Sequence, residues 1–323
     1  MRRVVWSVLT GLGVFFIIVA IMARFFIPGQ AIKFPLNEYS KSTLQADNGS
    51  YFSPKLVTEE SGVTLQATNT QKGDVAAAKA NGSSKIAVWQ SFTAIEDITH
   101  HQPVSIPAQG DTFAFDRKTG VLVPWSGNLV GGQHVSVSGQ GPLFPLGTKK
   151  QNYAVFDTTL VKPVTFHYTG TATTGGIGTY VFTATIPSTQ TGTQSLPGSL
   201  VGMSAAEVTL PEFYSAKYTY YVDPQTGVPL AVEQNVQQAL KDSTGTTRLV
   251  LLAADFKTTP ASLAAGVKTD KKGRNEISLL TVIIPIVGGL LGIVLVILGV
   301  VLSRSKPEDE EYEDDDRTVG VPA

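Results

Sequence analysis

Cysteine is absent from the 323 residues, and charged residues make up only 16% of the chain. The lack of cysteine excludes disulfide scaffolds, iron–sulfur clusters, cysteine-ligated zinc and thiol nucleophiles. About a quarter of the residues in a soluble protein are charged, so this chain is apolar by comparison. Its 31 glycines and 18 prolines favour a turn-rich β protein over a helical bundle.

Short motifs that signal catalysis or cofactor binding are also missing. The sequence holds no P-loop, no G-x-G-x-x-G and no H-E-x-x-H. The adjacent His100 and His101 cannot share one face of a strand, because neighbouring side chains point to opposite faces. Glu96 and Asp97 form a carboxylate pair that would suit acid–base chemistry, but adjacent carboxylates are usually just solvated. We therefore predict no cofactor, no metal site and no catalytic residue, and we do not expect an enzyme.

Two apolar runs, residues 4–23 and 277–302, are long enough to cross a bilayer. At about 1.5 Å per residue, 20 residues span roughly 30 Å, the thickness of the hydrocarbon core. We predict transmembrane helices at residues 4–24 and 277–302. Because Arg2 and Arg3 precede the first run, a cleaved signal peptide is the alternative to an uncleaved signal anchor. The length of the run and the lack of a good cleavage site favour the anchor.

The orientation follows from the basic residues that flank the two runs. Arg2 and Arg3 precede the first run, while Arg304 and Lys306 follow the second. Since lysine and arginine concentrate on the cytoplasmic side, both termini (residues 1–3 and 303–323) are predicted to be cytoplasmic. Four basic residues just before the second run oppose this orientation, but long domains translocate largely regardless of charge. The expected location is the plasma membrane, with the central domain outside the cytoplasm.

The charge is distributed unevenly along the chain. Residues 307–317 hold eight acidic residues and one basic residue, so we expect a disordered acidic tail. The tail is either merely solvated or a docking segment for a basic cytoplasmic partner. Residues 28–276 hold 19 basic and 18 acidic residues, and such a neutral segment is a poor candidate for binding nucleic acid.

The segment between the two runs alternates apolar and polar residues. Stretches rich in Val, Thr, Tyr and Phe with this alternation lie at 63–68, 85–90, 179–186 and 218–222. Alternation of this kind is typical of half-buried strands, so we predict a large antiparallel-sheet domain at residues 28–258.

A juxtamembrane helix or linker is expected at residues 259–276. It would begin at Thr259 and Pro260, because threonine is a common N-cap and proline suits the first helical position. Gly273 is the expected break before the second transmembrane helix.

One local repeat occurs in the predicted sheet domain. Residues 115–121 and 222–228 share an apolar residue, Asp, two variable positions, Thr-Gly and Val. The aspartate can accept a backbone hydrogen bond, proline suits a type I turn and the glycine supplies a positive φ. We therefore predict two hairpin turns with a bulge, built by Asp116, Thr119 and Gly120 and by Asp223, Pro224, Thr226 and Gly227. Either a common turn is used twice by chance, or residues about 40–150 and 151–256 are two related β units.

Each apolar run carries small residues four positions apart. These are Ser7 and Gly11 in the first run and Gly288 and Gly292 in the second. Small residues at this spacing let helices approach closely, so we predict that the two helices pair, although glycine is common in membrane helices anyway. The central part of neither run holds an ionisable residue, which argues against an ion pathway through these two helices alone.

Seven short blocks in a fixed order are distinctive in combination. They are residues 34–36 (FPL), 87–92 (AVWQSF), 113–120 (FAFDRKTG), 144–150 (FPLGTKK), 153–157 (Tyr, then Phe-Asp), 196–202 (LPGSLVG) and 221–227 (YVDPQTG). With the first helix, they resemble an actinobacterial family of membrane proteins labelled porin PorA, over nearly the whole chain apart from the acidic tail. The resemblance implies a two-pass membrane protein with a β-rich extracytoplasmic domain, and it supplies no catalytic residues.

The porin label implies a channel, but a membrane barrel crosses with strands and would not have two long apolar helices. The plan of two terminal helices around a β domain resembles that of lipid-binding scavenger receptors. We therefore expect the β domain to bind or transfer a lipid or another apolar envelope component, with membrane lipids as partners. The alternatives are a channel, formed by self-association, and an envelope structural or signalling protein that acts through its acidic tail.

Overall fold

The computed structural model describes residues 2–26, 31–104 and 110–304. The chain divides into two compact units. The helical unit contains the two terminal helices, and the sheet domain comprises Ile32–Glu276. The predicted acidic tail lies outside the described residues from position 305 onward, as does the predicted start of the β domain at residue 28.

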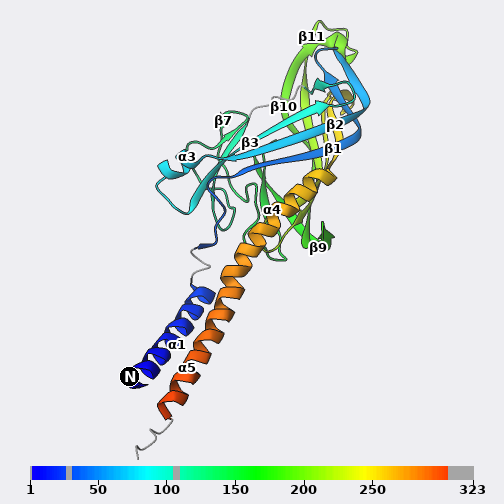
Figure 1. The fold of residues 1–323 in the computed structure, drawn as a ribbon. Coiled ribbons are helices and arrows are strands. Elements are labelled where there is room, and N and C mark those ends of the chain that lie inside the picture. Colours follow the sequence, from blue (N-terminus) through cyan, green and yellow to red (C-terminus); the bar gives the residue numbers. More distant parts are fainter. Residues whose placement is uncertain (1, 27–30, 105–109, 305–323) are drawn as a thin grey trace, which may run out of the picture. The chain divides into compact units, whose positions relative to one another are not determined.

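Helices and strands are named as in Figure 1. In chain order they are α1 (Arg2–Phe25), β1 (Tyr39–Ser53), β2 (Thr58–Gly73), α3 (Val75–Ala80), β3 (Ile86–Asp97), β4 (Gln102–Pro103), β5 (Asp111–Asp116), β6 (Leu129–Val130), β7 (Gln133–His134), β8 (Tyr153–Asp157), β9 (Lys162–Thr174), β10 (Ile177–Pro197), the 3₁₀ turn η1 (Gly198–Val201), β11 (Glu207–Val222), β12 (Pro229–Lys241), β13 (Thr247–Thr258), α4 (Pro260–Ser278), the π-helical turn η2 (Leu279–Ile283) and α5 (Ile284–Arg304).

Thirteen strands form the sheet of the described chain, and each pairs antiparallel with its neighbours. Their order is β7-β6-β5-β3-β2-β1-β13-β12-β11-β10-β9-β8, with β4 beside β3. The first long strand, β1, pairs with the last, β13, where Leu44 lies opposite Thr258. The prediction of a mainly antiparallel sheet between two apolar terminal helices that could span a membrane is confirmed.

The alternation along the strands separates an apolar inner face from a polar outer face. On β13, Leu252 and Phe256 point inward and are each 3% exposed. Asp255 and Lys257 occupy outward positions of the same strand and are exposed, with their charged atoms 3.6 Å apart. This is the pattern of a sheet with one face packed and the other in water.

Residues 121–140 connect β5 with β8, the last strand in the order. Isolated bridges pair Phe115 of β5 with Leu122, Val121 with Gln140, and Gln140 with Val155 of β8. The backbone of Gln140 makes two hydrogen bonds to β8, of 2.7 and 2.9 Å. Residues 121–140 therefore link β5 to β8, and the inner face of the sheet borders a space that is partly open.

Both copies of the repeated turn have the predicted hydrogen bonds. Asp116 and Asp223 each accept a bond of 2.9 Å from the backbone N–H two residues on. Gly120 and Gly227 have φ of +69° and +74°, and their N–H groups donate to the aspartate carbonyls at 2.9 and 2.8 Å. The second turn joins β11 to β12 in a hairpin with a register shift. The first joins β5 only to the bridge residues 121–122, so it is not a hairpin between two full strands.

The two turns also contact one connecting segment, residues 141–147. The N–H of Gly141 donates to the carbonyl of Gly120, and that of Phe144 to the carbonyl of Gly227, both at 2.9 Å. A Cβ added at either turn glycine would meet a carbonyl oxygen of this segment. Both halves of the sheet thus belong to one compact domain, and a common origin of the two halves stays a prediction.

The helix after β13 begins at Pro260, and the N–H of Leu263 donates to the carbonyl of Thr259 at 2.9 Å. The expected break at Gly273 is wrong, because α4 runs through this residue and continues through η2 into α5. One glycine inside a helix costs only about 1 kcal/mol relative to alanine, which is too little to end a long helix.

Candidate functional site in the cavity of the sheet domain

The inner face of the sheet domain borders a partly open cavity of about 620 Å³. Its lining comes from β1, β2, β3, β5, β8, β9, β11, β12 and β13 and from residues 141–143. Pockets that bind small molecules typically measure about 300–1,000 Å³, so this cavity has the size of a binding site. It is a candidate site that no motif of the sequence indicates.

Apolar side chains form one wall of the cavity. Leu44, Ala67 and Ile95 reach it from inward positions of β1, β2 and β3. They pack in the same cluster as Leu252 and Phe256 of β13. Apolar surface covered by a ligand contributes about 25 cal/mol per Å², so this wall favours a hydrocarbon group.

Hydroxyl and amide groups continue the lining along the same strands. Asn69 is the next inward residue after Ala67 on β2, and its Nδ2 donates to Ser91 Oγ and Thr93 Oγ1, both at 2.9 Å. Gln71 follows Asn69 along β2. The cavity is therefore amphipathic, with neutral polar groups beside the apolar wall.

A cluster of Asp157, Tyr214 and Tyr218 forms another part of the lining. The two phenol oxygens lie 3.3 and 3.2 Å from Asp157 Oδ2 and 2.5 Å from each other. Asp157 Oδ1 accepts a bond of 2.8 Å from the N–H of Leu160. Residues 214, 218 and 220 share one face of β11 because strand side chains alternate, and all three are tyrosines that line the cavity.

Burial in this cluster changes the acidity of its members. Burial raises the pKa of Asp157, although hydrogen bonds from Leu160 and the tyrosines oppose the change. Burial and the charge of Asp157 raise the pKa of Tyr214, and that of Tyr220 to about 12. Burial and the neighbouring phenol and carboxylate raise the pKa of Tyr218. The three phenols therefore keep their protons at neutral pH and act as hydrogen-bond donors.

Among the described residues that line the cavity there is no lysine, arginine or histidine. Two carboxyl groups are present, Asp157 and Asp111. Burial raises the pKa of Asp111, whose Oδ1 accepts a bond of 3.0 Å from the N–H of Gly131. A lining with carboxyl groups and no cation disfavours a negatively charged ligand.

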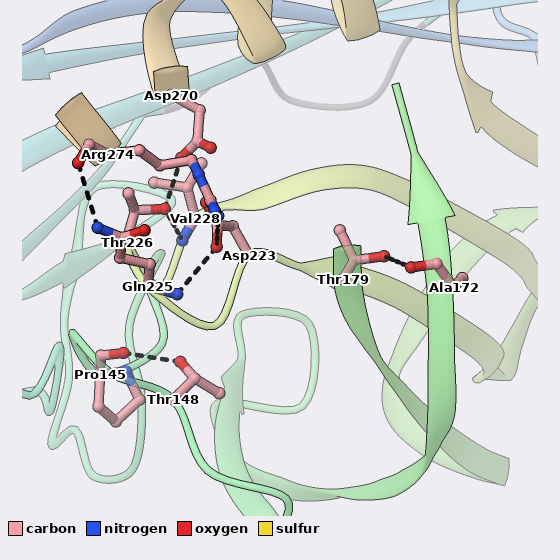
Figure 2. A network of polar contacts seen from close by, with 10 residues as sticks. All are labelled: Pro145, Thr148, Ala172, Thr179, Asp223, Gln225, Thr226, Val228, Asp270 and Arg274. Atoms are coloured by element: carbon pink, nitrogen blue, oxygen red, sulfur yellow. Dashed lines mark hydrogen bonds and ion pairs between the residues drawn. The ribbon is translucent and has the colours of Figure 1, made fainter. Parts of the chain in front are cut away.

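A second polar network lies outside the cavity lining, where the Asp223 turn meets α4 (Figure 2). Arg274 Nη1 donates to both carboxylate oxygens of Asp223, at 2.7 and 2.8 Å. Gln225 Nε2 donates to the carbonyl of Arg274 at 3.1 Å. Thr226 Oγ1 donates to Asp270 Oδ1 at 2.5 Å. The four predicted residues of the second turn, Asp223, Pro224, Thr226 and Gly227, lie at this end of the hairpin. The network joins the β11–β12 hairpin to α4.

The two carboxyl groups of this network share a buried site. Burial and the nearby Asp223 raise the pKa of Asp270 to about 7. Burial acts to raise the pKa of Asp223 as well, but hydrogen bonds from Asp270 and Arg274 outweigh it and hold this pKa below its ordinary value. Asp270 Oδ2 is buried and accepts no hydrogen bond. A proton held by the two carboxyl groups removes the repulsion between two negative charges, which accounts for the raised pKa of Asp270.

In the helical unit, α1 and α5 pack against each other in antiparallel fashion. A Cβ added at Gly292 would lie 2.7 Å from the carbonyl oxygen of Gly13, and one added at Gly288 would lie 3.7 Å from the Cβ of Ala20. The Arg24 guanidinium donates to the carbonyl of Thr281, in the π-helical turn, at 2.7 Å. Close backbone approach is how membrane helices associate in the absence of a hydrophobic driving force.

Of the two predicted packing residues of α1, Gly11 does not lie at this contact. Gly11 is exposed, and nothing beyond its own helix and chain neighbours lies within 4 Å of a Cβ added there. Ser7 is exposed as well. Gly13 is the glycine of α1 that faces α5. Residues two positions apart in an α-helix are separated by about 200° around the helix axis, so Gly11 and Gly13 lie on nearly opposite sides of α1.

The carboxylate pair Glu96 and Asp97 does not come together. Glu96 is exposed on β3, whereas Asp97 is fully buried and bonds to Tyr51 Oη at 3.2 Å and to His100 Nδ1 at 2.8 Å. The described residues contain no group of three or more His, Asp and Glu side chains that could hold a metal ion.

Two comparisons with known proteins give one finding each. A protein-family model described as Porin PorA matches residues 7–301. A search of curated proteins finds no match to the chain.

Proposed function

The chain belongs to the Porin PorA family, and we propose that it is a membrane protein whose sheet domain binds or transfers a lipid or another apolar envelope component. The observation that carries the proposal is the cavity of about 620 Å³ with its wall of Leu44, Ala67 and Ile95. A cavity with an apolar wall would shelter much of an apolar molecule from water.

The polar outer face supports a sheet domain that lies in water. The strands of a transmembrane barrel point apolar side chains outward to the lipid. On β12 the outward residues are Glu233, Asn235 and Gln237, while the inward residues that line the cavity are Val232, Gln234, Val236 and Gln238. A domain with this outer face would carry an apolar molecule inside rather than cross the membrane with its strands.

The proposal places the sheet domain outside the cytoplasm. The described part of the chain has two helices long and apolar enough to span a membrane, Val4–Phe25 and the apolar end of Pro260–Arg304. Arginines at positions 2, 3 and 304 favour cytoplasmic termini by the positive-inside rule. The domain between the helices would then meet components of the envelope.

Trp89 provides a direct test, because it lines the cavity. The full-length chain with Trp6→Phe and Trp125→Phe keeps Trp89 as its only tryptophan. A brominated long-chain monoacylglycerol is titrated into this protein in lipid nanodiscs, and tryptophan fluorescence is recorded. We expect saturable quenching, because a bound acyl chain brings bromine against Trp89.

A matched pair of variants locates the bound probe. Ala67→Phe fills the cavity from β2 and should weaken quenching at least tenfold, whereas Thr68→Phe places the same side chain on the opposite face of the strand. Equal quenching in both variants, or no quenching in the parent protein, would refute binding in the cavity.

The family description favours a second function, a channel-forming membrane protein. Because Gly13 and Gly292 bring α1 and α5 into close contact, a pore between the helices of one chain is excluded, and several chains would have to assemble. Planar-bilayer conductance that Gly292→Val abolishes and Gly11→Val preserves would favour the channel. Absence of conductance in planar bilayers, together with saturable quenching of Trp89 fluorescence, would favour ligand binding.

A further inference from the structure

The cavity lining has a chemical bias that narrows the class of ligand. Its polar side chains are hydroxyls and amides, such as Asn69, Ser91 and Thr93, together with two carboxyl groups. No lysine, arginine or histidine occurs among the described lining residues. A phosphate or carboxylate head group would lose its hydration here and gain no opposite charge.

The Asp157 cluster supplies the most acceptor-rich part of this lining. The oxygens of Tyr214, Tyr218 and Asp157 Oδ2 lie within hydrogen-bond distance of one another, and only the two phenol O–H groups can donate among them. These three oxygens therefore have more acceptor lone pairs than protons to donate. An ionised phosphate or carboxylate offers acceptors only. A ligand hydroxyl offers a proton to these oxygens and a lone pair in return.

We propose that the cavity selects amphiphiles whose head group donates hydrogen bonds and carries no negative charge, and that this group binds at Asp157, Tyr214 and Tyr218. The inference rests on the proposed function and names its ligand class. The acyl chain lies against the wall formed by Leu44, Ala67 and Ile95, and the head group meets the tyrosines of β11.

The experiment compares three brominated probes of equal chain length on the single-tryptophan protein described above. They are a monoacylglycerol, a fatty acid and a long-chain amine, at a pH where the acid and the amine are charged. We expect the monoacylglycerol and the amine each to bind at least tenfold more tightly than the fatty acid, because both donate hydrogen bonds and neither carries a negative charge. A fatty acid that binds as tightly as either of the other probes would overturn the inference while leaving the proposed function standing.

Three variants connect the selectivity to the cluster. Tyr218→Phe should weaken monoacylglycerol binding about two- to tenfold, since one hydrogen-bonding group is lost. Tyr221→Phe is the matched control, because this residue bonds to Glu233 at 3.3 Å and does not line the cavity. Asp157→Asn should bring the fatty acid to within about threefold of the monoacylglycerol by removing the negative charge.

The outcomes separate the two proposals. If no probe quenches Trp89, the proposed function fails, and the inference fails with it. If the probes bind but Tyr218→Phe behaves like Tyr221→Phe, binding in the cavity stands and the head-group site is wrong.

Discussion

Replacing Asp270 by asparagine tests whether the turn network holds a proton. The asparagine side chain would keep the oxygen that accepts from Thr226 and would place an amide where Asp270 has its second, buried oxygen. The amide carries no charge, so it avoids repulsion from Asp223 as the protonated acid does. The substitution thus preserves the contacts of the protonated network and removes the group that titrates.

The size of the effect follows from the pKa of Asp270. This pKa rises from 3.8 to about 7 on folding, so the folded protein holds the proton more tightly than the unfolded chain. The stabilisation is therefore present at low pH and is lost as the pH rises through about 7. Between pH 6 and pH 8 the loss is at most about 1.4 kcal/mol, and solvent screening lowers this figure. The pKa of Asp223 lies below its ordinary value, so this group changes stability only in acid.

Thermal unfolding of the full-length protein in nanodiscs, followed by the β signal in circular dichroism, measures the effect. A loss of 1 kcal/mol shifts the Tm of a domain of 150–250 residues by about 2–4 °C, so the native protein should melt up to about 5 °C lower at pH 8 than at pH 6. Asp270→Asn should remove most of this shift and should melt above the native protein at pH 8.

The exposed Asp255 on the outer face of β13 serves as the matched control. Asp255→Asn should leave the difference between pH 6 and pH 8 unchanged. Other ionisable groups are common to all three proteins and cancel in the comparison. If Asp270→Asn retains the full shift of the native protein, Asp270 does not hold the proton and the reasoning is refuted.

Three further predictions concern packing and backbone geometry. Gly292→Val should abolish crosslinking between cysteines introduced on α1 and α5 of this cysteine-free chain, whereas Gly11→Val should preserve it; loss in both would contradict the assigned contact. Gly227→Ala should cost more than about 2 kcal/mol in urea unfolding and Gly245→Ala about 1–2 kcal/mol, because both glycines have positive φ but only Gly227 meets a carbonyl oxygen. Asn128→Ala should cost about 2–4 kcal/mol in the same assay, since the buried side chain bonds to the backbone on two sides; a loss below about 1 kcal/mol would contradict its role.

Local signals predicted much of the fold. Alternation identified strands such as 218–222, and the Thr259–Pro260 pair identified the start of α4. The Asp116 and Asp223 turns followed from residue chemistry that acts within four positions of the chain. Each of these features is stabilised by contacts between near neighbours.

The cavity could not be predicted, because alternation shows which residues share a face but not which face borders a cavity. The bridges at Gln140 that connect β5 with β8 do not follow from a periodic pattern in the sequence. The Asp157–Tyr214 contact joins residues 57 positions apart. The same limit applies to Gly13. Small residues four positions apart indicate that helices can approach, but the partner helix decides which side of α1 is used.

Because β1 pairs with β13, the sheet cannot finish folding until the C-terminal strand has been synthesised. Leu44 lies opposite Thr258, so more than 200 residues of chain must be synthesised before the N-terminal strand acquires its second neighbour. Contacts between such distant segments are slow to form. Until then β1 is an open edge, and an open edge invites pairing with another chain. A product truncated before β13 would therefore keep that edge exposed, and aggregation rather than partial activity is its expected fate.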